Sequence, residues 1–176
     1  LYIIVTSLSL GAGQFLLTLW DVSGFELFSL AAMLLAAALI PVALTRSPSP
    51  ELRPTKRVGL RRLFAISPLA TATAFSSGMV NGAFYALAPV FVVGIGLSVA
   101  QVSTFMGSTI VGGLAMQYVV GRLSDQYPRS RVIVFVAALV TLLNLWLAQL
   151  TTAPFWQLLT VSVLWGGFNF TLYALA

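Results

Sequence analysis

Apolar residues occur in long runs along this chain, and short polar segments separate the runs. A helix that crosses a bilayer needs about 20 mostly apolar residues. Six runs meet this length, and they cover residues 1–20, 25–45, 63–93, 100–120, 132–150 and 155–176. The pattern predicts an all-α, polytopic membrane protein with six transmembrane helices.

The third run, residues 63–93, is long for a single span. It contains Pro68 and Pro89. Proline is tolerated in the first turn of a helix and breaks or kinks the interior. Pro68 therefore predicts a helix start, and Pro89 predicts a kink or a break.

The composition supports a membrane protein. Of the 176 residues, 59% are hydrophobic and 7% are charged, whereas a soluble domain carries about a quarter charged residues. The chain has no His and no Cys, which excludes imidazole bases, thiol nucleophiles and Cys/His metal sites. We therefore expect no enzymatic activity, no cofactor and no metal site.

The basic residues fall in two loops only. Six of the nine lie in residues 46–62, and the other three lie in residues 121–131. Two spans separate these loops, so both are expected on one side of the membrane, and the positive-inside bias makes that side the cytoplasm. There they would lie against anionic lipid, and we expect no nucleic-acid partner.

Small residues recur four positions apart within two of the runs, a spacing that lets helix backbones approach closely. The pairs are Gly78 and Gly82, Ser108 and Gly112, and Thr109 and Gly113. Helix packing is the favoured interpretation. The alternative is that these faces slide in a moving bundle.

Uncharged polar residues within the runs are the candidates for substrate contact. Ser77, Asn81 and Tyr85 follow one another at four-residue intervals and share one helical face. An amide without partners is costly in lipid, so this face should look into the bundle or into water. The cavity candidates are Gln14, Asn81, Tyr85, Trp165 and Asn169. For each of them the alternative role is an interhelical hydrogen bond.

No Asp, Glu, Lys or Arg lies in the middle of any run. An acid within the membrane would be the default proton-relay residue. A coupling site is therefore expected outside this sequence. The alternative is Glu26, at the outer end of the run 25–45.

Residues 121–131 read Gly-Arg-Leu-Ser-Asp-Gln-Tyr-Pro-Arg-Ser-Arg. In a turn between two spans, this stretch resembles the signature loop of the major facilitator superfamily, Gly-x-Leu-(Ala/Ser)-Asp-(Arg/Lys)-x-Gly-(Arg/Lys)-(Arg/Lys). The matching residues are Gly121, Leu123, Ser124, Asp125 and Arg129. Gln126, Pro128 and Ser130 depart from the pattern, and Arg131 follows directly. These departures suit the looser second copy of the loop in that family.

The resemblance implies a piece of a longer protein, covering about spans five to ten of a twelve-helix fold. Residues 1–45 would be the last two helices of the N-terminal half, and 46–62 the central cytoplasmic linker. Residues 63–176 would be the first four helices of the C-terminal half. Residues 84–89 and 96–102 also resemble a bacterial subgroup of these permeases whose substrates are poorly assigned.

The resemblance implies a secondary active transporter of the bacterial cell membrane, moving a small solute by alternating access and coupled to a proton or ion gradient. Its expected partners are the solute, the coupling ion and the lipid bilayer, and the family suggests a monomer. The alternatives are a non-transporting scaffold and a membrane enzyme subunit.

Gly121, Asp125, Arg129 and Arg131 are expected to form a conformational latch. Gly121 would let two helices approach, and Asp125 would meet either a neighbouring helix N-terminus or Arg129 in one arrangement of the helices. The alternative is that the arginines only orient the loop and Asp125 only caps the turn.

Overall fold

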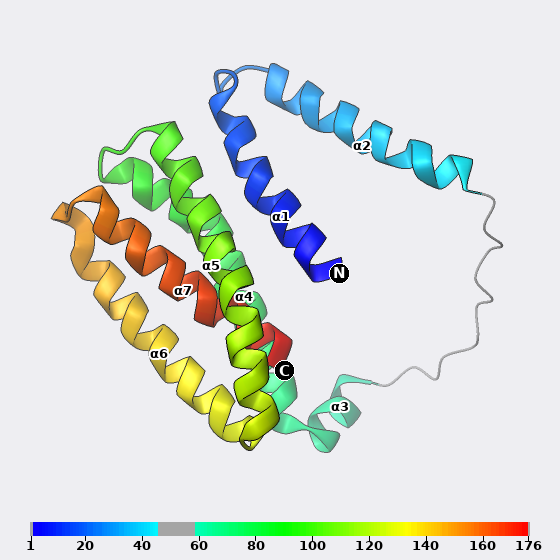
Figure 1. The fold of residues 1–176 in the computed structure, drawn as a ribbon, viewed down its shortest axis with the longest axis vertical. Coiled ribbons are helices and arrows are strands. Elements are labelled where there is room, and N and C mark those ends of the chain that lie inside the picture. The colour runs from blue at the N-terminus through cyan, green and yellow to red at the C-terminus, as the bar shows by residue number, and fades with distance from the viewer. Residues whose placement is uncertain (1, 46–58, 176) are drawn as a thin grey trace.

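The structure is a computed structural model that describes residues 2–45 and 59–175, and its helices are labelled in Figure 1. They are α1 (Tyr2–Phe15), α2 (Glu26–Leu44), α3 (Leu60–Ile66), α4 (Pro68–Gly94), α5 (Val99–Gln126), α6 (Arg129–Gln149) and α7 (Phe155–Leu175). Short 3-10 helices, Leu16–Thr18 and Leu150–Thr152, extend α1 and α6. The described residues contain no strand, so the all-α prediction is confirmed.

Five helices are long and apolar enough to cross a membrane, namely α2, α4, α5, α6 and α7. The first predicted span, residues 1–20, contains α1 and the 3-10 turn after it, and its described apolar helical segment is Ile4–Thr18. The regular helix ends at Phe15, where the chain tightens into a 3-10 turn.

The third predicted span, 63–93, is divided at its start. Its first residues belong to α3, and α4 begins at Pro68 as predicted. Proline fits there because the first N–H of a helix has no partner within the helix. Pro89 does not end α4, which continues to Gly94, so of the predicted kink or break the break is wrong.

The charged loop 121–131 is mostly helical. Helix α5 continues to Gln126 and α6 begins at Arg129, so only Tyr127 and Pro128 connect them. Charged side chains do not interrupt backbone hydrogen bonding, and the first strong helix breaker in the stretch is Pro128. Most of the predicted linker, residues 46–58, lies outside the described residues.

The most extensive helix contact joins α5 to α7. A side chain at Gly112 would collide with the backbone carbonyl of Val163, and one at Gly166 would collide with that of Thr109. The hydroxyls of Ser108 and Ser162 lie 2.9 Å apart across the same interface and share a hydrogen bond. The small residues of α5 therefore pack backbone against backbone, as the packing interpretation predicts.

The other predicted small-residue pair, Gly78 and Gly82 on α4, makes no such contact. Both glycines are exposed, and nothing in the described part of the chain comes within 4 Å of a side chain built there. For this pair the structure supports neither close packing nor a sliding contact.

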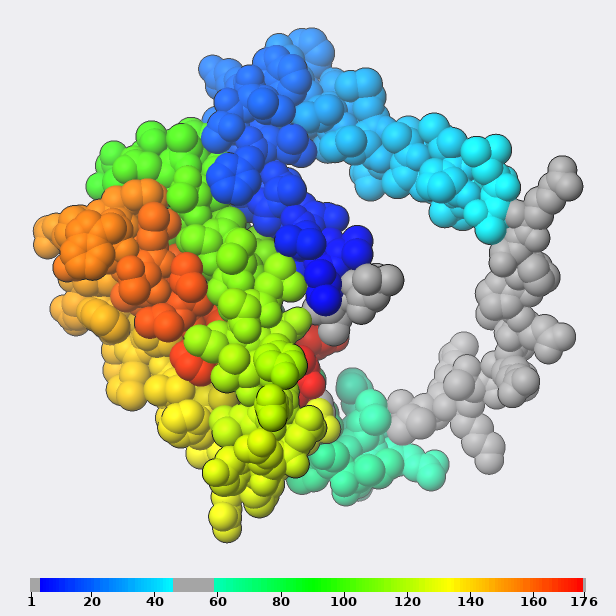
Figure 2. Space-filling view, viewed as in Figure 1, coloured from blue at the N-terminus to red at the C-terminus, as the bar shows by residue number. Residues whose placement is uncertain are grey.

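Helices α1 and α2 differ in how they meet the rest of the chain. α1 packs on α5, with the ring of Phe15 against Gly107. α2 has no buried residue and extends away from the bundle (Figures 1 and 2). The turn between them is closed by Asp21, whose carboxylate accepts hydrogen bonds from the backbone and hydroxyl of Ser23. These bonds hold the pKa of Asp21 below its usual value.

Helix α3 and the α5–α6 connection lie at the same end of the bundle (Figure 1). A small cavity there is lined by Ser67, which follows α3, by Arg129 of α6 and by Leu175 of α7. The described parts of the two basic segments thus share one end of the bundle.

The α5–α7 contact predicts that Gly112→Val destabilises the protein by about 1–3 kcal/mol or more, because the new side chain overpacks a backbone contact. Thermal unfolding of the purified protein in detergent measures the effect. Gly78→Val is the matched control, since no described residue comes within 4 Å of a side chain built at that position. Equal unfolding temperatures for the two variants would contradict the packing described here.

Candidate functional site

A cleft of about 160 Å³ lies where α1 meets α4, α5 and α7. Its lining residues are Ser7, Leu10, Asn81, Tyr85, Ile110, Gly113, Gln117, Phe170 and Tyr173. Hydroxyl and amide groups from all four helices reach this cleft, and no charged side chain of the described residues lines it. We call it the four-helix cleft.

Two of the predicted cavity residues, Asn81 and Tyr85, line the four-helix cleft from successive turns of α4. Tyr85 is 37% exposed and its ring is stacked on that of Phe170, with the ring centres 6.3 Å apart and the ring planes inclined by 27°. The ring of Phe84 lies edge-to-face with that of Tyr85, with the ring centres 5.5 Å apart. The cleft therefore combines an amide and a phenol with an aromatic wall.

Directly behind Asn81 lies Asn169 of α7. The Asn169 amide nitrogen donates a hydrogen bond of 2.6 Å to the side-chain oxygen of Asn81, which joins α4 to α7. Asn169 is only 1% exposed, and its own side-chain oxygen has no partner among the described residues. The observed bond to Asn81 uses the amide nitrogen of Asn169, so the polar contact that this buried side chain makes is with α4.

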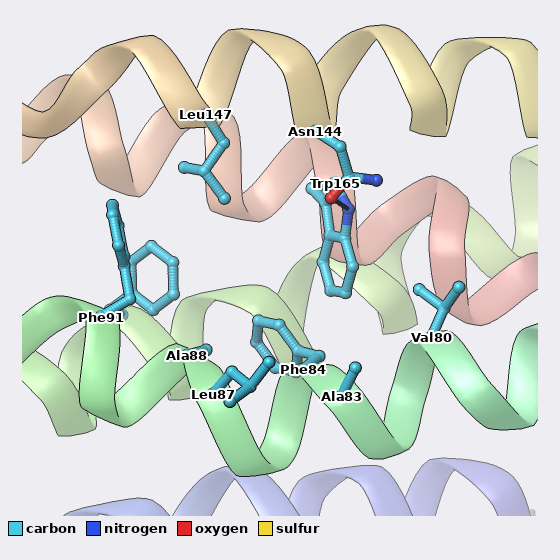
Figure 3. A pocket seen from close by; sticks show the side chains of 10 residues that line it. Val80, Ala83, Phe84, Leu87, Ala88, Phe91, Asn144, Leu147 and Trp165 are labelled. Carbon is cyan, nitrogen blue, oxygen red and sulfur yellow. Dashed lines mark hydrogen bonds between the residues drawn. The ribbon is translucent and has the colours of Figure 1, made fainter.

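Trp165, the remaining α7 candidate, lies on the other side of α4. Its ring stacks on Phe84 at 4.5 Å, and its indole N–H donates to the side-chain oxygen of Asn144 at 3.1 Å. Figure 3 shows this indole between α4 and α6 beside Asn144. Trp165 is therefore a packing and hydrogen-bonding residue here and does not reach the four-helix cleft.

A second region, the α4–α6 groove, consists of two cavities of about 380 and 450 Å³ that share Val80 and Asn144. Trp165 lines the first cavity and Asn169 lines the second. The structure thus divides the predicted cavity residues between two sides of α4. The 3.6-residue period identified the polar positions, but it could not assign them to one cavity.

Gln14 lines neither region and is half-buried on α1, where Ser7 reaches the cleft instead. Ser7, Gln117 and Tyr173 were not among the predicted site residues. Gln117 carried a usable signal, because it lies one turn beyond Gly113 and so shares its face. Tyr173 carried the same kind of signal, because it lies one turn beyond Asn169 and shares its face. Ser7 joins the cleft through tertiary packing, and its sequence position gave no comparable signal.

The latch residues are arranged differently from the prediction. Arg129 donates from Nε to the backbone oxygen of Leu175 at 2.6 Å, and from its terminal nitrogen to that of Ala174 at 3.4 Å. Asp125 is exposed and forms neither an ion pair nor a hydrogen bond with any described residue. The expected Asp125–Arg129 pair is therefore absent from this arrangement, and the arginine holds α7 instead.

The two other latch residues contribute no contact in this state. Gly121 is exposed on α5 with nothing among the described residues within 4 Å of a built side chain, so it does not bring two helices together here. Arg131 is exposed on the first turn of α6. Within the motif, the observed interhelical contact is that of Arg129 with α7.

Comparison with known proteins gives one match. A family model described as Major Facilitator Superfamily matches residues 2–176, which is nearly the whole chain. No curated protein and no solved structure matches. The family match agrees with the resemblance carried by the sequence of the α5–α6 connection.

The Asn81–Asn169 hydrogen bond predicts energetic coupling between α4 and α7. In a double-mutant cycle of Asn81→Ala and Asn169→Ala, we expect a coupling energy between about 0.6 and about 1.7 kcal/mol in unfolding measurements. Asn169→Ala combined with Gln101→Ala is the control, because among the described residues the Gln101 side chain bonds only to Ser98, at the N-terminus of α5. That pair should be additive within about 0.5 kcal/mol. Additivity in both cycles would contradict the bond.

Proposed function

This chain belongs to the major facilitator superfamily, and on that basis we propose that it moves a small, uncharged, polar or amphipathic solute by alternating access. It is an integral membrane protein of a family that transports small molecules across membranes. The four-helix cleft is the observation that supports the finer proposal.

The position of the cleft suits alternating access. We propose that residues 1–45 belong to one half of the transporter and residues 63–176 to the other, with the segment 46–62 linking them. The cleft is lined by α1 from the first segment and by α4, α5 and α7 from the second. Solute bound there would contact both halves, and rocking of one half against the other would open it to either side in turn.

The lining of the cleft supports an uncharged solute. The amides of Asn81 and Gln117 each offer both a donor and an acceptor, and Tyr85 adds a hydroxyl beside an aromatic wall. Such groups can replace the hydration of a neutral polar molecule, whereas a charged one would need an opposite charge. Asn169 would act behind this surface by fixing the orientation of Asn81.

We further propose that a proton or ion gradient drives transport in the bacterial cell membrane, with residues 46–62 and 121–131 facing the cytoplasm. The clustering of basic residues at one end of the bundle supports this orientation. In this proposal the contact of Arg129 with α7 stabilises one of the two conformations. Asp125 would form its contact in the other conformation.

Uptake by the full-length protein in liposomes tests the transport proposal. Tyr85→Phe removes a hydroxyl from the cleft and should reduce uptake of the transported solute about tenfold or more, because a partner group is left unpaired. Tyr118→Phe is the matched control on the exposed face of α5 and should leave uptake unchanged. An ionophore that collapses the gradient should abolish accumulation. A scaffold would show no uptake with any member of a solute panel.

The latch proposal predicts that Arg129→Gln alters transport without preventing membrane insertion. Loss of a charge-assisted hydrogen bond, about 1.5–3 kcal/mol, should shift the balance between conformations about tenfold or more and slow uptake. Arg122→Gln is the control, because within residues 2–45 and 59–175 the Arg122 side chain bonds only to Tyr118 on its own helix. Unchanged uptake by Arg129→Gln at normal expression would overturn the latch.

A further inference from the structure

The Asn81 amide meets the four-helix cleft in one orientation. Its side-chain oxygen accepts the hydrogen bond from Asn169, which lies behind the cleft and does not line it. The Asn81 nitrogen bonds to no described residue, and the side chain is half-buried at the cleft. Although an amide carries both kinds of group, the oxygen of Asn81 is turned to α7, so the end left for a solute is the NH₂ group, which can only donate.

Asn169 opposes a change of this orientation. Its side chain is 1% exposed, and its amide nitrogen donates to Asn81. Rotation of the Asn81 amide alone would set one NH₂ group against another, and a buried donor that loses its acceptor is costly. The buried asparagine therefore holds its neighbour as a donor toward the cleft.

The cleft also has a flat aromatic surface, formed by Tyr85 and Phe170. The Phe170 ring is stacked on that of Tyr85, and it lies edge-to-face with those of Phe84 and Trp165 at 6.5 and 6.4 Å between ring centres. Gly113 of α5 allows this position, because a side chain there would collide with the Phe170 ring. Three neighbouring rings and the α5 backbone therefore hold this surface in place.

The size and the groups of the cleft narrow the class of solute. Its volume of about 160 Å³ is below the roughly 300–1,000 Å³ of sites for drug-sized ligands, which favours a molecule with a single ring. A donor beside an aromatic surface suits a flat ring that carries an acceptor. A sugar fits less well, because its ring is not flat and its hydroxyls need acceptors as well as donors.

We propose that the solute of this cleft is a neutral, planar ring compound that bears a carbonyl group. The ring stacks on Phe170 and Tyr85, and the carbonyl accepts a hydrogen bond from the Asn81 amide. Asn81 and Phe170 then determine specificity, and Asn169 is a positioning residue that acts through Asn81. This assignment rests on the role of the cleft as the solute site in the function proposed above.

Three neutral probes separate the two requirements. Benzamide has a flat ring and a carbonyl, aniline keeps the ring without the carbonyl, and cyclohexanecarboxamide keeps the carbonyl without the flat ring. Saturation-transfer difference NMR titrations with the full-length protein in lipid nanodiscs, with empty nanodiscs as the blank, measure their Kd values. We expect benzamide to bind about fivefold to tenfold more tightly than either of the others, the effect of one hydrogen bond or one aromatic contact.

The ratio of the aniline Kd to the benzamide Kd tests the two asparagines. Asn81→Leu should bring this ratio close to one, because the donor is lost. Asn169→Leu should lower it about fivefold while the aniline Kd changes little, because a freed Asn81 can turn its oxygen to the cleft. A merely structural role of Asn169 would weaken both probes alike and leave the ratio unchanged. Gln149→Leu is the control, since this exposed amide at the end of α6 lies outside the cleft.

The aromatic surface has its own variant. Phe170→Leu should bring the Kd of cyclohexanecarboxamide close to that of benzamide, because the flat ring loses its partner. The inference is overturned by equal binding of the three probes to the wild-type protein, by no binding of benzamide, or by a wild-type ratio in Asn81→Leu.

Binding in nanodiscs requires no transport, so failure of this inference and failure of the proposed function can be told apart. Liposome uptake of any solute, together with equal Kd values for the three probes, would overturn the solute class and leave the transport function standing. The expected probe preferences without uptake of any solute would support the recognition described here and contradict transport.

Discussion

Backbone contact between α5 and α7 is the constraint on which the rest of this structure depends. Glycines on both helices bring carbonyl groups against α-carbons, and a serine pair bonds across the same interface. In lipid there is no hydrophobic drive between helices, so close van der Waals packing of this kind must supply the association. It fixes α7 against α5, and so it also fixes the positions from which α7 reaches its other neighbours.

Two of those neighbours meet α7 through polar groups. Asn169 bonds to Asn81 on α4, and Trp165 bonds to Asn144 on α6. If α7 were rotated about its axis, Asn169 and Trp165 would point away from their partners and neither bond could form. Their polar groups would then face lipid, which costs free energy. The packing of α5 on α7 therefore indirectly aligns the face of α4 that carries Asn81 and Tyr85, and this alignment creates the four-helix cleft.

The sequence allowed the membrane class and most of the helices to be predicted, because runs of apolar residues report directly on the solvent around them. The ends of the helices were harder to predict where charged residues follow an apolar run. The apolar run 100–120 predicted that the helix ends near residue 120, but the charged residues from Arg122 to Asp125 are helical as well. Helical period placed Asn81 and Tyr85 correctly on one face. It could not place Ser7 beside them, because a contact between distant helices depends on packing that one helix does not encode.

The interlocked glycines also set the mechanics of the bundle. A displacement of α7 along α5 by one turn would bring Ser162 or Phe170 to the place of Gly166, where the α5 backbone leaves no room for a side chain. The two helices therefore resist sliding along each other, and we expect them to move together as one rigid body. The contact between α1 and α5 is softer, because the ring of Phe15 rests on Gly107 without a backbone collision. Of these two interfaces, we therefore expect the one between α1 and α5 to permit sliding of one helix along the other.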